Sequence, residues 1–233
     1  MPFINPYLEI VHPLLVELNL EIVYIGGAVI PLYVPELTKS HGYRETLDID
    51  VIVLALSNYW DLPDLEKQLS KQGITPSMDP GDPRCRYILN HTEKGPIKID
   101  ILATNSDVHG FPCDWFIDAA QNTEERELKS GMKILIPQIT YMMALKLKAF
   151  FDRGVNAFDS KDLQDIILLL TVEENRKELR IKTPNSLVSQ FVWDSFGKLA
   201  QSRAVIDYIE GDFRSDEEEI SMAIIRFINM PLF

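Results

Sequence analysis

The chain is poor in cysteine and histidine, it has no long apolar run, and its basic residues are outnumbered by acidic ones. The two cysteines, Cys85 and Cys113, follow no spacing typical of zinc ligands or of redox dithiols, so we expect free thiols in a reducing compartment. The four histidines are scattered without ligand spacing. No Ser/His/Asp or Cys/His constellation can be read from the order of residues.

No apolar run approaches the roughly 18 residues that a membrane-spanning helix needs, and the N-terminus lacks the layout of a secretory signal. We therefore expect a cytoplasmic protein with no membrane partner. The net charge of −12 argues against a wholly basic surface for nucleic acid. The segment 129–182 has a local surplus of basic residues, which is either a solvated helical face or the side where RNA or a triphosphate docks.

The 233 residues are 46% hydrophobic, which is ample for a packed core in one large or two small domains. The first half alternates helices and strands, which predicts an α/β core that handles nucleotides. The predicted strands are residues 22–25, 47–54, 84–89 and 96–102, with strand-like pieces at 113–119 and 132–136. The predicted helices of this half are residues 5–18, 28–33 and 62–72.

From Pro137 the hydrophobic period becomes helical. Pro137 is placed to start a helix and Gly154 to end it, and Ser160 or Asp159 can cap the next helix. Further helices are expected after residue 184 and over residues 220–228. The second half of the chain is therefore predicted to be helical.

Two aspartates, Asp48 and Asp50, stand two residues apart in an apolar stretch. In a strand they share one face, while the apolar residues around them point into a core. Adjacent like charges raise each other's cost of ionisation, which a divalent cation usually relieves. Asp100 shows the same pattern in its own strand. The three acids predict magnesium-assisted handling of a nucleoside triphosphate, with two ions clamping the attacking and leaving oxygens.

A glycine pair, Gly26-Gly27, follows one predicted strand and opens a helix. Its backbone N–H groups and the positive helix end can bind phosphate, although strand-to-helix turns often use glycine for no such purpose. The spacing is that of neither a Walker P-loop nor a dinucleotide-binding fingerprint. Conventional kinases, NTP hydrolases and dehydrogenases are therefore disfavoured.

Lys146 and Arg153 lie two turns apart on one stripe of a predicted helix. Either both side chains face the nucleotide site of the catalytic core, or they are surface cations whose aliphatic parts cover the apolar face of the helix. Asp162 and Asp165, three apart on the next helix, either orient those cations or complement the helix dipole.

Together these motifs resemble the nucleotidyltransferases of the DNA polymerase β superfamily, and most of all their abortive-infection and toxin–antitoxin branch. The resemblance covers roughly residues 20–170. The motifs that carry it are Gly26-Gly27-Ala28, Arg44-x-Thr46-x-Asp48-x-Asp50, the strand acid Asp100, Lys146-Leu147-x-Ala149-x-x-x-Arg153 and Ser160-Lys161-Asp162-x-x-Asp165.

The resemblance implies an α+β fold, with a mixed-sheet catalytic domain in residues 1–136 and a mostly helical domain in residues 137–233. It implies that the nucleotide binds in a cleft between these domains. Asp48 and Asp50 would hold Mg²⁺, as two ions, with Mn²⁺ as the alternative. Asp100 would be the third acid, which helps to activate the acceptor hydroxyl.

The resemblance also implies that Gly26 and Gly27 contact the triphosphate and that Lys146 neutralises its charge, with Arg153 as a further contact. Asp162 would correspond to an acid in the helical domain of the toxin-like branch. The remaining supporting residues are Arg44, Thr46 and Asp165. The chain departs from the family in having Gly-Gly in place of Gly-Ser, and in the length of the loop between Gly27 and Asp48.

The expected activity is transfer of a nucleoside monophosphate from an NTP to a hydroxyl group. The acceptor would be a tRNA end, a protein side chain or a small molecule such as an aminoglycoside, and the acidic chain favours the last two. A toxin-type enzyme would have a cognate antitoxin. The alternative is a non-catalytic module that keeps the fold for binding, against which the intact acids count.

Overall fold

The protein is described from a computed structural model, and the account covers residues 5–34, 46–54, 56, 61–109, 114–153, 157–181, 186–212 and 218–230. The chain forms two compact units. Of the described residues, the sheet unit takes 5–31 and 46–138, and the helical unit takes 32–34 and 139–230.

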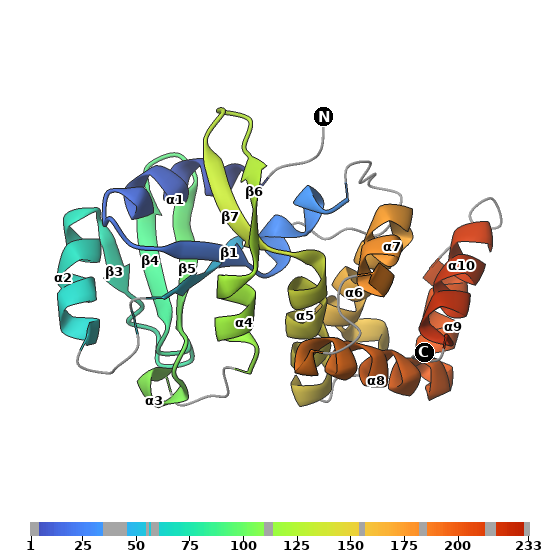
Figure 1. The fold of residues 1–233 in the computed structure, drawn as a ribbon. Coiled ribbons are helices and arrows are strands. Elements are labelled where there is room, and N and C mark those ends of the chain that lie inside the picture. The colour runs from blue at the N-terminus through green and yellow to red at the C-terminus, as the bar shows by residue number, and fades with distance from the viewer. Residues whose placement is uncertain are drawn as a thin grey trace. The chain divides into compact units, whose positions relative to one another are not determined.

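A five-stranded mixed sheet forms the centre of the sheet unit (Figure 1). Its strands in chain order are β1 (Ile22–Ile25), β2 (Asp48–Val53), β3 (Ile74–Pro76), β4 (Arg86–His91) and β5 (Gly95–Ala103). Their spatial order is β1-β2-β5-β4-β3, and β2 runs parallel to β5 while the other neighbours are antiparallel. A separate hairpin of β6 (Thr123–Glu127) and β7 (Lys133–Pro137) contacts β1 through β7. The prediction of a mixed sheet is confirmed.

Short helices accompany these strands. They are α1 (Pro6–Val16), the 3₁₀ helix η1 (Gly27–Leu32), α2 (Leu62–Lys71), α3 (Ser106–His109) and α4 (Phe116–Gln121). The first helix begins where Asn5 caps it, since Asn5 Oδ1 accepts a hydrogen bond from the Tyr7 amide at 2.8 Å. Pro6 follows in the first turn, where a missing N–H costs nothing.

The burial of β2 changes along its length. In its first half Ile49 and Val51 are buried, while Asp48 and Asp50 on the opposite face are half-buried. In its second half every residue is buried. The face that carries Asp48 and Asp50 is therefore partly open at the beginning of β2, and the rest of the strand lies in the core.

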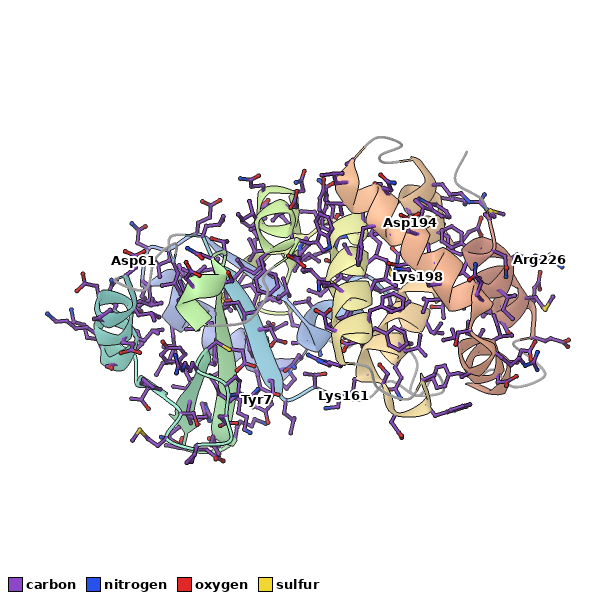
Figure 2. All side chains as sticks on the ribbon, turned by 90° about the horizontal axis from the view of Figure 1, so that it is seen from below. Tyr7, Asp61, Lys161, Asp194, Lys198 and Arg226 are labelled. Carbon is purple, nitrogen blue, oxygen red and sulfur yellow. The ribbon has the colours of Figure 1, made fainter. Side chains whose placement is uncertain are left out.

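The helical unit is built around α5 (Ile139–Arg153), which contacts α6, α7 and α8. Its other helices are η4 (Ala157–Asp159), α6 (Lys161–Thr171), α7 (Glu173–Ile181), α8 (Leu187–Gln201), α9 (Arg203–Asp212) and α10 (Glu218–Ile228). Ser160 caps α6 as predicted, because its Oγ accepts a hydrogen bond from the Leu163 amide at 3.2 Å. On α8, Lys198 places its Nζ 5.5 Å from the ring centroid of Phe151 on α5, and Figure 2 labels Lys198.

Several local predictions need correction. The piece 113–119 was expected to be a strand, but its described part falls mainly in helix α4, and Cys113 lies outside the described residues. The short helix expected over residues 28–33 is the 3₁₀ helix η1, which begins one residue earlier. Strands β3 and β6 were not predicted. Gly154 also lies outside the described residues, and α5 extends to Arg153.

The helical part after Pro137 was predicted correctly, with α5 beginning two residues later. Among the described residues, no helix is long and apolar enough to cross a membrane.

Candidate functional site

The three aspartates predicted from the sequence lie together on the polar face of the sheet. Asp50 on β2 is the register partner of Asp100 on the parallel strand β5, and Asp48 is the partner of Lys98. Register partners on adjacent strands project to the same side of a sheet, and residues two apart do so as well. The parallel pairing of β2 with β5 thus brings Asp48, Asp50 and Asp100 onto one face.

Arg86, which the sequence reasoning missed, reaches this face from β4. It is the register partner of Asp100 on the side of β5 away from β2. Its Nε and Nη2 donate to the two carboxylate oxygens of Asp100 at 2.8 and 2.7 Å. Its Nη2 also lies 3.6 Å from Asp48 Oδ2. The hydrogen bonds to Asp100 raise the pKa of Arg86, so the guanidinium is charged at any pH the folded protein meets.

Asp82, in the loop before β4, is a fourth carboxylate of this group. It accepts a hydrogen bond from Arg86 Nη1 at 3.0 Å and one from the Ser77 hydroxyl at 2.7 Å. The bond from Ser77 lowers the pKa of Asp82, and Arg86 and Lys98 act in the same direction. The Nζ of Lys98 lies 3.8 Å from Asp82 Oδ1.

We call this group the carboxylate cluster. It consists of Asp48, Asp50, Asp82 and Asp100 with the cations Arg86 and Lys98. Of these six described side chains, four are acidic and two are basic.

The glycine pair lies against the carboxylate cluster. Gly26 has a φ of +77°, which disfavours any other residue, and a Cβ at this position would collide with Asp50 Oδ2. A Cβ on Gly27 would collide with Thr46 Oγ1. Glycine is therefore favoured at both positions by the close approach of the Asp50 and Thr46 side chains, whether or not the pair binds phosphate.

A buried asparagine supports the start of β2. The Nδ2 of Asn5 donates to the backbone oxygen of Thr46 at 2.6 Å, while the same side chain caps α1. This hydrogen bond links the beginning of α1 to Thr46, two residues before Asp48. The role of Asn5 as a helix cap gives no indication of this second contact. Arg44, predicted as a supporting residue, lies outside the described residues.

The fit of this face to metal ions can be judged from its donors. The described residues contain no group of three or more His, Cys, Asp or Glu side chains arranged to hold a metal ion. Both oxygens of Asp100 accept hydrogen bonds from Arg86. Asp48, whose side chain is 40% exposed, and Asp50 form a pair of carboxylates on one face. Such a pair suits one Mg²⁺, which proteins bind through one or two carboxylates plus substrate phosphates.

Lys146 lies in the helical unit and is paired there. Its Nζ is 2.6 Å from Asp165 Oδ2 and 3.7 Å from Asp162 Oδ1, and its side chain is 9% exposed. Arg153 Nη1 donates to Asp162 Oδ2 at 2.6 Å. The two aspartates therefore form ion pairs with the two cations, and Asp162 also lies in the first turn of α6.

This second group, the ion-pair cluster, consists of Lys146, Arg153, Asp162 and Asp165. Its two positive and two negative charges balance. Burial raises the pKa of Asp165, and the charge of Lys146 opposes this. Within this cluster, only the side chain of Arg153 is well exposed. The predicted site residues are thus divided, with Gly26, Gly27, Thr46 and the three strand acids in the sheet unit and the ion-pair cluster in the helical unit.

No model of a protein family matches the sequence, and no curated protein matches it either. Among solved structures, the chain is similar to an antigenic nucleotidyltransferase-like protein from Paracoccidioides brasiliensis, with a TM-score of 0.57. The two sequences are 15% identical, and the similarity covers 94% of this chain and 92% of the other. At this identity the match shows a shared fold. It confirms the predicted nucleotidyltransferase-like α+β fold followed by a helical part.

A second match is to the antibiotic-resistance factor ANT(2'')-Ia. Its TM-score is 0.45 and its identity 13%, over 85% of this chain and 95% of that one. A TM-score this low does not show a shared fold.

Proposed function

We propose that the chain is a nucleotidyltransferase, which transfers a nucleoside monophosphate from an NTP to a hydroxyl group. The observation that carries the proposal is the polar face where Asp50 and Asp100 are register partners, with Asp48 beside them, in a nucleotidyltransferase-like fold. Carboxylates gathered on an otherwise apolar sheet are costly unless a cation or substrate uses them.

In the proposed reaction, the acceptor oxygen forms a bond to the α-phosphorus and the bond from that phosphorus to the bridging oxygen breaks, so pyrophosphate leaves. The proton of the hydroxyl passes to a carboxylate oxygen of the polar face. Asp48 and Asp50 would hold the divalent ion, Mg²⁺ or Mn²⁺, which when bound neutralises charge on the triphosphate. Phosphoryl transfer needs little more from a protein than positioning and charge neutralisation.

The remaining predicted roles stay proposals. Gly26 and Gly27 leave the backbone beside Asp50 free of side chains, which would allow a phosphate to approach. For Lys146 and Arg153 the contact with nucleotide rests on the sequence resemblance, because their observed partners are Asp162 and Asp165. The toxin role and an antitoxin partner rest on the same resemblance.

The acceptor is best sought among proteins and small molecules. The net charge of −12 disfavours binding of a tRNA, whose phosphates would be repelled.

Incubation of the protein with each labelled NTP, Mg²⁺ and a cell extract tests the proposal. We expect one NTP to label one class of acceptor, and Asp50→Asn to slow labelling by at least about 10²-fold, the scale for loss of one preorganised charge at a reacting centre. The control is Asp64→Asn on α2, an exposed carboxylate outside the cluster, which should leave the rate unchanged. Absence of label with every NTP, or equal rates in both variants, would refute the proposal.

One observation favours a second candidate, a non-catalytic binding module. Arg86 already compensates Asp100, as an arginine in a site without metal would. The two candidates differ in their thermal stability, because a ligand that binds the native state raises the melting temperature. An enzyme should be stabilised by Mg²⁺ with an NTP, whereas a module without a nucleotide site should melt at the same temperature with or without them.

A further inference from the structure

The side-chain amide of Asn5 makes two contacts, one within its own helix and one with a distant part of the chain. Its Oδ1 accepts a hydrogen bond from the Tyr7 amide at 2.8 Å, and its Nδ2 donates to the backbone oxygen of Thr46 at 2.6 Å. Asn5 is fully buried. A buried amide group whose oxygen and nitrogen are both bonded is held in one orientation, so it fixes the positions of both partners.

The cap of α1 does not by itself call for asparagine. Aspartate and serine cap helices about as well as asparagine does. An ionised aspartate accepts hydrogen bonds but donates none, and serine has one oxygen for both contacts. Asparagine carries an acceptor and a donor on separate atoms of one planar group, and in Asn5 the donor binds Thr46. The contact with Thr46 therefore sets Asn5 apart from these other caps.

Thr46 lies just before the sheet begins. The pairing of β2 with β5 starts at Asp48, and its pairing with β1 starts at Asp50. Between Thr46 and the strand, Leu47 is 57% exposed, so burial of its side chain contributes little to holding this stretch. The hydrogen bond from Asn5 therefore fixes the chain two residues before the strand pairing does.

Thr46 in turn lies against the glycine pair. Its Oγ1 occupies the space that a Cβ on Gly27 would need, as Asp50 does for Gly26. Both side chains belong to the stretch that enters and begins β2. A displacement of Thr46 would therefore change the space beside the glycine pair, which is where a phosphate would approach in the proposed reaction.

We propose that Asn5 is a positioning residue of the proposed nucleotidyl transfer, because its amide holds Thr46 against Gly27 and so fixes the surroundings of the glycine pair. The inference rests on the proposed function and adds to its site a residue that precedes every motif of the family resemblance. Asn5 acts through Thr46 and the glycine backbone, so loss of its donor should slow transfer in molecules that are fully folded.

Asn5→Asp tests the inference, because the new side chain keeps the shape and the helix cap but, when ionised, cannot donate to Thr46. The assay is the initial rate of labelling at varied NTP, with a fixed amount of cell extract and below the melting temperature of each protein. We expect kcat/KM for the NTP to fall about 10-fold or more, since a misplacement of 1 Å can cost about 10²-fold.

The matched control is Asn122→Asp, in the same unit. The Nδ2 of Asn122 donates to the backbone oxygen of Asp118 at 2.8 Å, within the end of α4, so this variant loses a similar bond away from the glycine pair and should keep the wild-type rate. A rescue at low pH is the second readout. Protonation of the new carboxyl in Asn5→Asp restores a donor, so its rate relative to the wild type at the same pH should rise as the pH falls.

Amide hydrogen exchange gives a readout that needs no activity. In Asn5→Asp, residues 46–50 should exchange faster than in the wild type, whereas α1 should keep its protection, because the cap is retained. If Asn5→Asp does not fold, Asn5→Ser, which keeps the cap with a shorter group, is measured in its place.

Equal rates in the wild type and Asn5→Asp, an equal loss in Asn122→Asp, or unchanged exchange of residues 46–50 would each overturn the inference and leave the proposed function standing. Absence of label with the wild type would refute the proposed function, and the inference with it. The two failures can therefore be told apart by whether the wild type forms product.

Discussion

The two charged clusters of this protein contrast in charge balance and in exposure. The carboxylate cluster of the sheet unit contains four acidic and two basic described side chains, and Asp48 at its edge is 40% exposed. The ion-pair cluster of the helical unit has balanced charges, and Lys146 within it is buried. Buried charges depend on their partners for stability, whereas a partly exposed group of acidic residues is open to solvent and is typical of a functional site.

The clusters also differ in how the chain builds them. The ion-pair cluster joins residues of adjacent helices, and its two acids are three apart on one helix face. The carboxylate cluster joins three strands and a loop. The acid-rich cluster is therefore assembled by the pairing of strands that are distant in sequence, and the ion-pair cluster takes its acids from local helical spacing.

The largest expected effect on stability is at Lys146. Lys146→Ala leaves Asp165 buried without its closest cation, so we expect a loss of about 3–5 kcal/mol in the free energy of unfolding, measured in urea. The matched control is Lys148→Ala on the same helix, which removes an exposed pair with Asp152 and should cost less than about 1 kcal/mol. Equal losses would show that the ion-pair cluster does not stabilise the helical unit.

Gly26→Ala should have the next largest effect, because it combines strain with a collision. The φ of +77° costs a non-glycine residue about 1–3 kcal/mol, and the new Cβ must also displace Asp50. Gly95→Ala is the control, since Gly95 has a φ of +73° and no atom within 4 Å of a Cβ built there. The loss of stability in Gly26→Ala beyond that in Gly95→Ala measures the cost of the collision with Asp50. Equal losses in the two variants would show that the collision has no cost.

The pH dependence of stability should differ in sign between the clusters. The pKa of Asp82 is lowered in the folded state, so its ionisation stabilises the fold above the unfolded pKa, and this is lost as the pH falls. The pKa of Asp165 is raised by burial, so its contribution is present at low pH and lost as the pH rises.

Urea unfolding at about pH 3 and about pH 7 checks these signs, because linkage acts between the unfolded and folded pKa values. Asp82→Asn should cost more stability at the higher pH, and Asp165→Asn should cost less there than at the lower pH. The same sign in both variants would contradict the assignment of either group.

The smallest expected effect concerns the thiol of Cys85. Here we expect a difference in chemical reactivity between the folded and unfolded protein, and no change in stability. Burial raises the pKa of Cys85 to about 12, and the negative charge of Asp100 adds to the shift. In a Cys113→Ser variant, the remaining thiol should therefore react slowly with a disulfide reagent in the native protein and fast in urea. Fast reaction of the native protein would show that the core beneath the carboxylate cluster is open.

Several elements could be predicted because their signals are local. Strand β1 was predicted with its observed bounds, and Ser160 was predicted as a helix cap. Helix α4 was predicted as a strand because six residues are too few to separate a helical from a strand period.

Arg86 had a signal that was overlooked. The hairpin of β4 and β5 pairs His91 with Gly95, so residues placed symmetrically about this turn are partners, and Arg86 and Asp100 are such a pair. A prediction of the hairpin register would have found it.

The sequence by itself determined that Asp48 and Asp50 share one face and that Asp162 and Asp165 share another. Side-chain direction follows from the backbone period, which is a local property of a strand or helix. Only the tertiary structure decided that Asp100 lies beside Asp50, that Arg86 occupies both oxygens of Asp100, and that Lys146 is buried between two acids. These contacts depend on which strands and helices pack together and in which register, and burial of apolar surface over the whole chain sets that choice.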